Sequence, residues 1–162
     1  MPRLFPGWWS ARVQQLFRLV KEMKKRDMVQ VTLTEDDTEL LTTIVRSHRQ
    51  RVDPPRALPL LERKLSEAEF HTSESIPANV VTMNSTVLLK DLDSGEERVT
   101  TLAYPHGANP DRGRISVMTP IGTALLGLKV PTVIKCVTPD GPKRYQVKRI
   151  IYQPEAADEI DN

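Results

Sequence analysis

The 162-residue sequence is poor in several residue types, and each shortage excludes a class of protein. It has one cysteine, Cys136, so no disulfide can form within the chain, and a disulfide-stapled secreted fold is excluded. Only 5% of its residues are aromatic, so we expect a modest core of aliphatic side chains. It contains no apolar run long enough to cross a bilayer. The net charge of +2 is too small for bulk electrostatic binding of a polyanion.

The remaining composition is that of an ordinary globular chain. Hydrophobic residues make up 39% of it and charged residues 27%. The length suits one domain, or one domain with a smaller unit. A single cysteine fits a reducing compartment, so we expect a cytoplasmic protein.

Residues 1–28 form a basic segment that differs from the rest of the sequence. Apolar residues recur at helical spacing between Val13 and Val20, and basic residues surround them. The basic residues that follow the two tryptophans are Arg12, Arg18, Lys21, Lys24, Lys25 and Arg26. A basic amphipathic segment over 1–27 can lie weakly on an anionic membrane or on a partner surface. The alternative is a disordered extension without function, with Met28 as the effective start of the protein.

Residues 29–76 predict a short strand followed by an antiparallel pair of helices. After the strand, apolar residues recur at steps of three and four on both sides of a turn that contains Pro54 and Pro55. The stripes are Leu40, Leu41, Ile44 and Val45 before the turn, and Leu58, Leu61, Leu65 and Ala68 after it. Each stripe is narrow. We therefore expect the helices mostly to cover each other as a short coiled coil, which could project from a domain rather than be buried in it.

Residues 77–156 predict a second unit, built mainly of strands. A polar stretch at 71–78 separates it from the helices, and the apolar pattern then changes from helical to alternating. Gly95 and Gly141 mark two hairpin turns. The strand-like runs lie at 80–92, 97–104, 132–137 and 145–152. We expect an α+β architecture, with an antiparallel sheet, one short helix packed on it, and a frayed acidic tail over 157–162.

The stretch ISVMTPIGTALLGL, at 115–128, indicates a strand, a turn and a short helix. Thr119 is in position to cap the helix. Pro120 follows at the first helical position, where a missing N–H costs nothing. Gly127 suits the C-terminal cap. The helix has one apolar face, so we expect it to lie on the sheet.

Three stretches together resemble the Gre family of transcription elongation factors. They are VVTMNS at 80–85, MTPIGTALLGL at 118–128 and YQPEA at 152–156. The resemblance is strong from about 77 to 156, weaker over 29–70, and does not cover 1–27. It implies an FKBP-like C-terminal domain behind a short antiparallel coiled coil.

The resemblance also implies a partner, the RNA polymerase core enzyme. In the Gre family the C-terminal domain docks at the rim of the polymerase secondary channel, and the coiled coil reaches inward. The residues that match the docking block are Met118, Thr119, Pro120 and Ile121. These four are candidates for the polymerase contact, and the alternative is that they are core residues with a helix cap.

The turn of the helical pair departs from the Gre pattern. Gre factors carry paired acidic residues there, which help to hold a catalytic Mg2+ ion in the polymerase active site. Here the tip candidates are Arg49, Arg51, Asp53 and Arg56, one acid among basic residues. A helix of a dozen residues also reaches only about 18 Å. We therefore expect a non-catalytic regulator that competes with Gre factors without stimulating transcript cleavage, and that needs no metal or other cofactor.

A different function, that of a peptidyl-prolyl isomerase or chaperone-type binding module, is the alternative that an FKBP-like fold suggests. An isomerase pocket of that type is lined with aromatic side chains, and the chain offers only Tyr104, Tyr145 and Tyr152 after Phe70. Analogy of fold alone carries this alternative. We expect a monomer with no small-molecule substrate and no sequence-specific contact to nucleic acid.

Other chemical candidates are weak. His48, His71 and His106 are scattered, whereas a metal site needs convergent ligands. Cys136 lies in a strand pattern, which indicates a buried and inert thiol.

Two groups of charged residues accompany the predicted hairpins. Acidic residues crowd the turn at 91–97, and indicate a solvated face or an acidic contact surface. Basic residues in the last strand indicate an exposed strand edge, where they discourage strand addition. These are Lys143, Arg144, Lys148 and Arg149. A nucleic-acid patch is the other interpretation, but interleaved aromatic residues are lacking.

Overall fold

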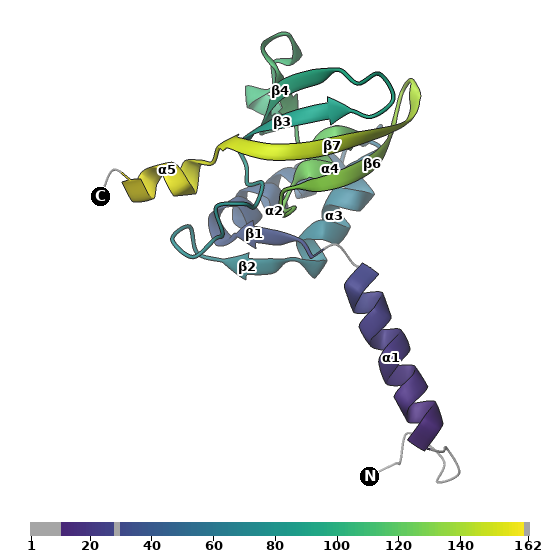
Figure 1. The fold of residues 1–162 in the computed structure, drawn as a ribbon. Coiled ribbons are helices and arrows are strands. Elements are labelled where there is room, and N and C mark those ends of the chain that lie inside the picture. The colour runs from purple at the N-terminus through teal and green to yellow at the C-terminus, as the bar shows by residue number, and fades with distance from the viewer. Residues whose placement is uncertain (1–10, 28–29, 161–162) are drawn as a thin grey trace.

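A computed structural model describes residues 11–27 and 30–160 of the chain. The predictions for residues 1–10, for 28–29 and for the last two residues lie outside the described residues. The predicted N-terminal helical pattern is present as α1 (Ala11–Asp27), a single helix that extends away from the rest of the molecule (Figure 1). None of the described helices is long and apolar enough to cross a membrane.

The described strands form a five-stranded sheet and a separate two-stranded one. The five strands are β3 (Thr86–Asp91), β4 (Glu97–Ala103), β5 (Arg114–Ser116), β6 (Thr132–Thr138) and β7 (Gly141–Tyr152). Their order in the sheet is β5-β4-β3-β7-β6. The pairs formed by β3, β4, β6 and β7 are antiparallel, whereas β5 runs parallel to β4. The two-stranded sheet pairs β1 (Thr32–Thr34) with β2 (Glu69–His71) in parallel.

The large sheet is curled, and its two faces differ in polarity. Ile134 on β6 is opposite Tyr145 on β7, and both are buried. Their chain neighbours Lys135 and Arg144 are also opposite each other, and both are exposed. This alternation places apolar side chains on the concave face and charged ones on the convex face. Both predicted hairpin glycines have positive φ, 78° at Gly95 and 110° at Gly141.

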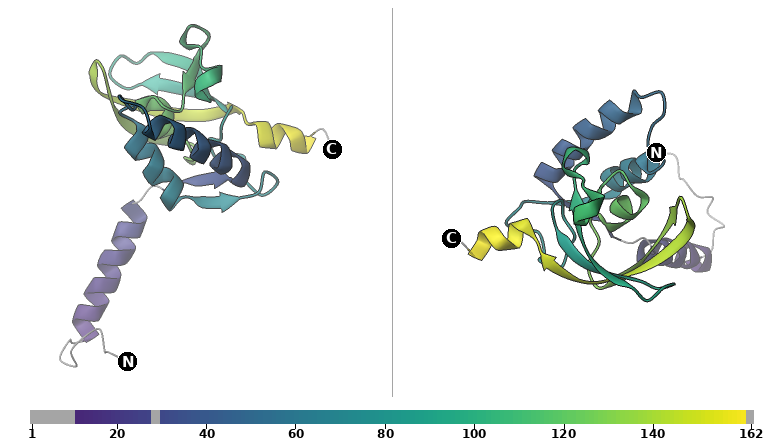
Figure 2. Two further views of the ribbon diagram at one scale, coloured as in Figure 1. Left: turned by 180° about the vertical axis from the view of Figure 1, so that it is seen from behind. Right: turned by 90° about the horizontal axis from the view of Figure 1, so that it is seen from above.

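Three helices cover the concave face of the sheet (Figure 2). They are α2 (Glu35–Arg49), α3 (Leu58–Glu67) and α4 (Pro120–Leu125). Leu41 and Val45 of α2 and Leu58 and Leu61 of α3 belong to the same hydrophobic core as the sheet and α4. The predicted α+β class is confirmed. The expectation that the helical pair projects from the molecule is wrong, because its apolar stripes pack into this shared core.

Three other expectations are corrected by the structure. First, β7 is an interior strand between β3 and β6, so its basic residues do not lie on a sheet edge. Second, β3 begins only at Thr86, and the preceding residues form a turn that is buried except at Asn84, which is exposed and has φ of 63°. Third, the acidic C-terminal segment is helical over α5 (Pro154–Ile160) rather than frayed. Gln153 anchors this helix by donating to the carbonyls of Pro77, at 2.9 Å, and Val80, at 2.8 Å.

Replacing Leu61 by alanine tests whether the helical pair and the sheet unfold together. Leu61 is completely buried in the shared core, so Leu61→Ala should lower the free energy of unfolding by about 2–5 kcal/mol. Urea unfolding would be followed by far-UV circular dichroism for the helices and by near-UV signals for the tyrosines of the sheet. We expect both probes to report one transition, shifted to lower urea.

The neighbouring residue supplies a matched control. Leu60 is 42% exposed, so Leu60→Ala should change the free energy of unfolding by no more than about 0.5 kcal/mol. Loss of helix at lower urea, with the sheet signal unchanged, would show instead that the helical pair is an independent unit.

Candidate protein-binding surface

The turn between β5 and α4 is held by hydrogen bonds among its own residues. The Thr119 hydroxyl accepts from the Gly122 N–H at 3.1 Å and donates to the Ser116 carbonyl at 2.7 Å. The Ser116 hydroxyl accepts from the Met118 N–H at 3.1 Å. The predicted cap at Thr119 is present, and Pro120 begins the helix. These bonds hold the turn in one conformation without a partner.

Gly122 allows the first turn of α4 to lie directly against the end of β5. A Cβ atom at this position would lie 2.0 Å from the Ser116 carbonyl oxygen and 2.8 Å from its carbon. Because both are backbone atoms, they cannot move aside as the end of a flexible side chain could, and only glycine fits. Because α4 lies so close to the end of β5, the buried Thr123 hydroxyl can donate to the Val117 carbonyl at 2.5 Å.

The structure divides the four residues that the sequence grouped as a docking candidate. Met118 is only 9% exposed and belongs to the core. Ile121 is half-buried and packs against the same core. Thr119 is exposed, and Pro120 is partly exposed beside it. A contact here would therefore use a small rigid projection formed by Thr119 and Pro120, and its role in binding stays a prediction.

The tip of the helical pair is exposed and mostly basic. Arg51, Asp53 and Arg56 all lie in the exposed connection between α2 and α3. At the base of this connection, the Arg49 Nε donates to the Glu62 carboxylate at 2.7 Å and ties the two helices together. One free carboxylate therefore stands at the tip. A Mg2+ ion needs several convergent oxygen ligands, which this arrangement does not supply.

Lys64 connects the helical pair to the helix that carries the Thr119 turn. Its ammonium is buried and donates to the carbonyls of Ala124, at 2.9 Å, and Leu126, at 2.8 Å. These carbonyls lie at the C-terminal end of α4, where helix carbonyls lack partners within the helix. Lys64 thus satisfies the end of α4 from the side of α3, and Thr119 caps the opposite end.

Burial lowers the pKa of the Lys64 ammonium to about 7, well below its ordinary value of 10.5. The two carbonyl acceptors and the negative end of the α4 dipole act against this shift, because they stabilise the charged form. A buried lysine with its pKa near neutrality makes the stability of this contact depend on pH.

Asp37 connects α2 to the segments at Met83 and Tyr104. Its carboxylate accepts from the Met83 N–H at 3.1 Å and from the Tyr104 hydroxyl at 2.9 Å. Its own N–H donates to the Thr34 hydroxyl, which caps the helix, at 3.1 Å. Burial raises the pKa of Asp37, while its hydrogen bonds from Met83 and Tyr104 oppose that rise.

Sequence reasoning missed both Lys64 and Asp37, although a signal for each was present. Lys64 lies three residues after Leu61, and Asp37 lies four residues before Leu41, so each is on the apolar stripe of its helix. A charged residue on such a stripe must be paired or hydrogen-bonded if the stripe is buried. The two charges therefore indicate polar partners only if the apolar stripes face a second layer of the molecule.

The weaker candidates do not come together. His48 contacts the Ile44 carbonyl at 2.9 Å within its own helix, His71 lies 3.2 Å from Glu69, and His106 stacks on Tyr104. Burial raises the pKa of the Cys136 thiol, so this thiol is a poor nucleophile. Across residues 11–27 and 30–160, no group of three or more histidine, cysteine, aspartate or glutamate side chains could hold a metal ion.

Comparisons with known proteins agree on one group of relatives. The family model described as "Transcription elongation factor, GreA/GreB, C-term" matches residues 76–152. The regulator of nucleoside diphosphate kinase of Escherichia coli K12 is 43% identical over 98 residues, which are 60% of this chain and 72% of that protein. Transcription elongation factor GreA of Thermosipho africanus is 40% identical over 87 residues, 54% of each protein.

A solved structure extends the similarity beyond the residues that the family model matches. The prokaryotic transcription elongation factor GreA/GreB from Nitrosomonas europaea superimposes with a TM-score of 0.63 at 32% sequence identity. The superposition covers 76% of this chain and 98% of that structure, so it includes far more than residues 76–152.

Replacing Lys64 by methionine should remove a pH dependence of stability. The folded-state pKa is about 7, whereas the unfolded chain keeps the ordinary value of 10.5. Between these values the unfolded chain binds more protons, so the free energy of unfolding rises with pH, by at most about 1.4 kcal/mol per unit from this group. Below pH 7 both states are protonated, and the group adds no slope. Urea unfolding at about pH 7, 8 and 9 should show a rise in the free energy of unfolding of the wild type that Lys64→Met lacks.

Lys129→Met is the matched control, because Lys129 is exposed and its replacement should leave the wild-type slope intact. Equal slopes in the wild type and in Lys64→Met would contradict the assignment.

Proposed function

Because the chain belongs to the family of the GreA/GreB transcription elongation factors and the regulator of nucleoside diphosphate kinase, we propose that it regulates transcription elongation by binding the RNA polymerase core enzyme. It docks at the rim of the secondary channel as a monomer, through an FKBP-like domain and a short helical hairpin. It competes there with Gre factors and does not stimulate transcript cleavage. Its site of action is the cytoplasm.

One observation carries the docking part of this proposal. In sequence, Thr119 and Pro120 match the block that the resemblance to the Gre family assigns to docking, and hydrogen bonds and Gly122 hold their turn in shape. A rigid contact residue loses little conformational entropy on binding, so even a small projection contributes usefully to affinity.

The length and charge of the helical hairpin support the proposal that the chain does not stimulate transcript cleavage. Its helices have 15 and 10 residues, which corresponds to about 22 and 15 Å. Apolar residues of both helices belong to the core that they share with the sheet. The tip presents Arg51, Asp53 and Arg56, without a second free acid beside Asp53. A hairpin of this length and charge is unsuited to deliver a Mg2+ ligand deep into a channel.

The isomerase alternative gains no support from the tyrosines. Tyr145 is buried under the guanidinium of Arg98, which lies 5.4 Å from the ring centroid. Tyr104 donates to Asp37, and Tyr152 is exposed at the end of β7. These rings do not line one site. The relative's name implies an effect on nucleoside diphosphate kinase. In this chain such an effect would arise indirectly, through a change in transcription.

Competition for polymerase tests the proposal directly. A labelled Gre factor from the same host would be bound to core enzyme, and its release by the chain measured by fluorescence anisotropy, alongside cleavage in stalled complexes. We expect release of the Gre factor, inhibition of its cleavage, and no cleavage by the chain alone. Pro120→Glu should weaken the competition at least about tenfold, because a charge replaces an apolar contact while an acid at a helix start remains favourable.

Pro110→Glu is the matched control. Pro110 is exposed, and like Pro120 it begins a short helix, η2 (Pro110–Arg112), but that helix lies before β5. The control should compete like the wild type. Cleavage stimulated by the chain itself, or no binding to core enzyme above an unrelated protein, would refute the proposal.

The basic tip should act mainly on the rate of association. Arg51→Glu with Arg56→Glu reverses two exposed charges and leaves the Arg49–Glu62 pair intact. Charges at the rim of an interface steer encounter and are screened by salt. We expect slower binding to core enzyme at low salt and a flatter salt dependence in stopped-flow measurements.

Lys129→Glu with Arg112→Glu makes the same change in net charge away from the tip, and it should leave the association rate near the wild-type value. An unchanged salt dependence in the tip variant would argue that the tip does not face the polymerase.

A further inference from the structure

Two irregularities in β7 change which of its side chains face outward. Leu89 of β3 is opposite Val147, but Leu88 is opposite Arg149, so Lys148 is an extra residue. A second shift of register makes Ile151 extra. A β-bulge of this kind allows two consecutive side chains to point to one face of a sheet. Accordingly Lys148 and Arg149 are both exposed, and so are Ile151 and Tyr152.

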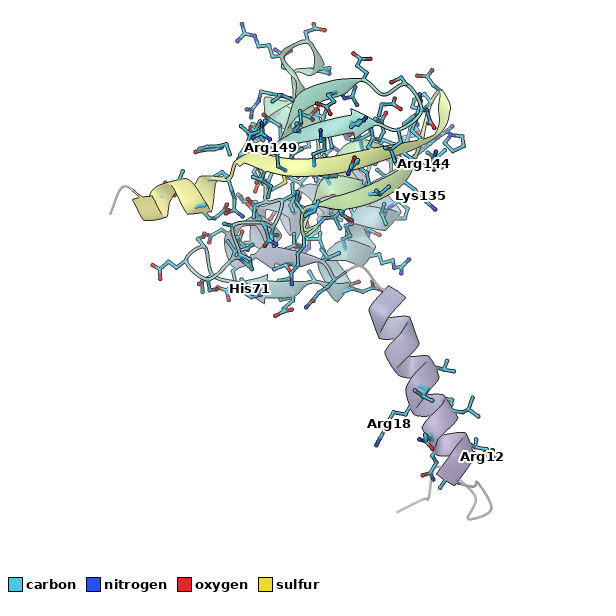
Figure 3. All side chains as sticks on the ribbon, viewed as in Figure 1. Arg12, Arg18, His71, Lys135, Arg144 and Arg149 are labelled. Atoms are coloured by element: carbon cyan, nitrogen blue, oxygen red, sulfur yellow. The ribbon has the colours of Figure 1, made fainter. Side chains whose placement is uncertain are left out.

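The bulges contribute to a cationic group on the convex side of the sheet, which we call the outer cationic face. Its members are Lys90, Lys135, Arg144, Lys148 and Arg149. Figure 3 labels three of them along β6 and β7, on the side of the sheet opposite α4. Since β7 is an interior strand, these charges have no role in protecting a sheet edge.

Acidic residues neutralise only part of this face. Arg144 lies 3.6 Å from Asp93, and Lys148 lies 2.6 Å from Glu97. Within the described part of the chain, Lys90, Lys135 and Arg149 form no ion pair. Five cations therefore face two acids, which leaves an excess of three positive charges. Lys148, together with Lys90 and Arg149, lowers the pKa of Glu97, so that carboxylate stays ionised within the cationic field.

The uncharged side chains of the same face include hydroxyls, an amide and an aromatic ring. The Thr86 and Thr101 hydroxyls are 2.8 Å apart, and Gln146 lies between Lys90 and Val133 in the strand register. Tyr152, opposite Thr86, is 50% exposed at the end of the row of cations on β7. Phosphate groups bind to such cations, amides and hydroxyls, and an exposed ring offers a surface on which a base can stack.

We propose that the outer cationic face binds a single-stranded nucleic acid, without sequence preference, through its phosphates and one base stacked on Tyr152. The phosphates contact Lys135, Arg149 and the neighbouring cations. This surface is separate from the Thr119–Pro120 projection, and the proposal does not rest on binding to polymerase.

The composition of the face favours nucleic acid over an acidic protein. Three of its five cations are lysines, and lysine is depleted in the cores of protein interfaces. Val99, Val133 and Val137 are exposed on this face, but they do not form one continuous patch. Val99 is opposite Leu88, which Arg149 borders on its other side. Gln146 is opposite Val133, and Lys135 separates Val133 from Val137. An interface with a protein would need a continuous apolar centre.

Binding of a labelled 12-nucleotide uridine RNA to the full chain tests the proposal, by fluorescence anisotropy between about 50 and 200 mM salt. We expect a Kd of roughly 1–100 μM that weakens steeply with salt. Lys135→Ala with Arg149→Ala should weaken binding about tenfold at low salt and flatten the slope of log K against log salt by about 1.4, which corresponds to two lost phosphate contacts. Tyr152→Ala should weaken binding of single strands and leave binding of a duplex unchanged.

The N-terminal helix supplies the control, because it is also basic. Arg12→Ala with Arg18→Ala removes the same charge from α1 and should leave the slope unchanged. The proposal is overturned if that pair causes the loss and the sheet pair does not, or if no RNA binds at low salt. It is also overturned if an acidic peptide of equal charge displaces RNA as well as unlabelled RNA does, since the face would then select acidic protein. Unfolding midpoints of all variants would confirm that each is folded.

Discussion

The five-stranded sheet has one apolar face, and the need to keep that face from water decides where the helices lie. The helix that crosses it, α4, has only six residues and cannot cover the concave side alone. The helical pair completes the cover, with Leu41, Val45, Leu58 and Leu61 in the common core. The helical pair therefore forms a structural layer of this molecule and does not project from it.

Covering the sheet in this way buries charge. Lys64 and Asp37 enter the layer between helices and sheet, and each is accommodated because backbone groups there lack other partners. The Lys64 ammonium satisfies the carbonyl end of α4, and the Asp37 carboxylate satisfies the Met83 N–H. Such contacts contribute little net stability, but breaking one leaves a buried group unpaired. They fix the position of the hairpin relative to the Thr119 turn.

The same arrangement leaves two surfaces free for partners. The Thr119–Pro120 projection stands at the start of α4, supported from below by Gly122 and from the far end by Lys64. The helices α2, α3 and α4 lie on the concave side of the sheet and leave its convex face uncovered (Figure 2). The first surface is small and rigid, which suits a specific contact with protein. The second is broad and cationic, which suits a flexible polyanion.

Much of the local structure was readable from the sequence. The α+β class, both hairpin glycines and the Thr119 cap follow from interactions within a few residues, and side-chain periodicity carries that information. Tertiary structure alone decided that the hairpin packs on the sheet, that β7 is interior, and that Lys148 and Arg149 share one face. These outcomes depend on strand order, register and the area left uncovered by α4, all set by contacts between residues far apart in the chain. An alternating pattern reveals two faces of a strand, but it does not reveal its neighbours or where one extra residue interrupts the pairing.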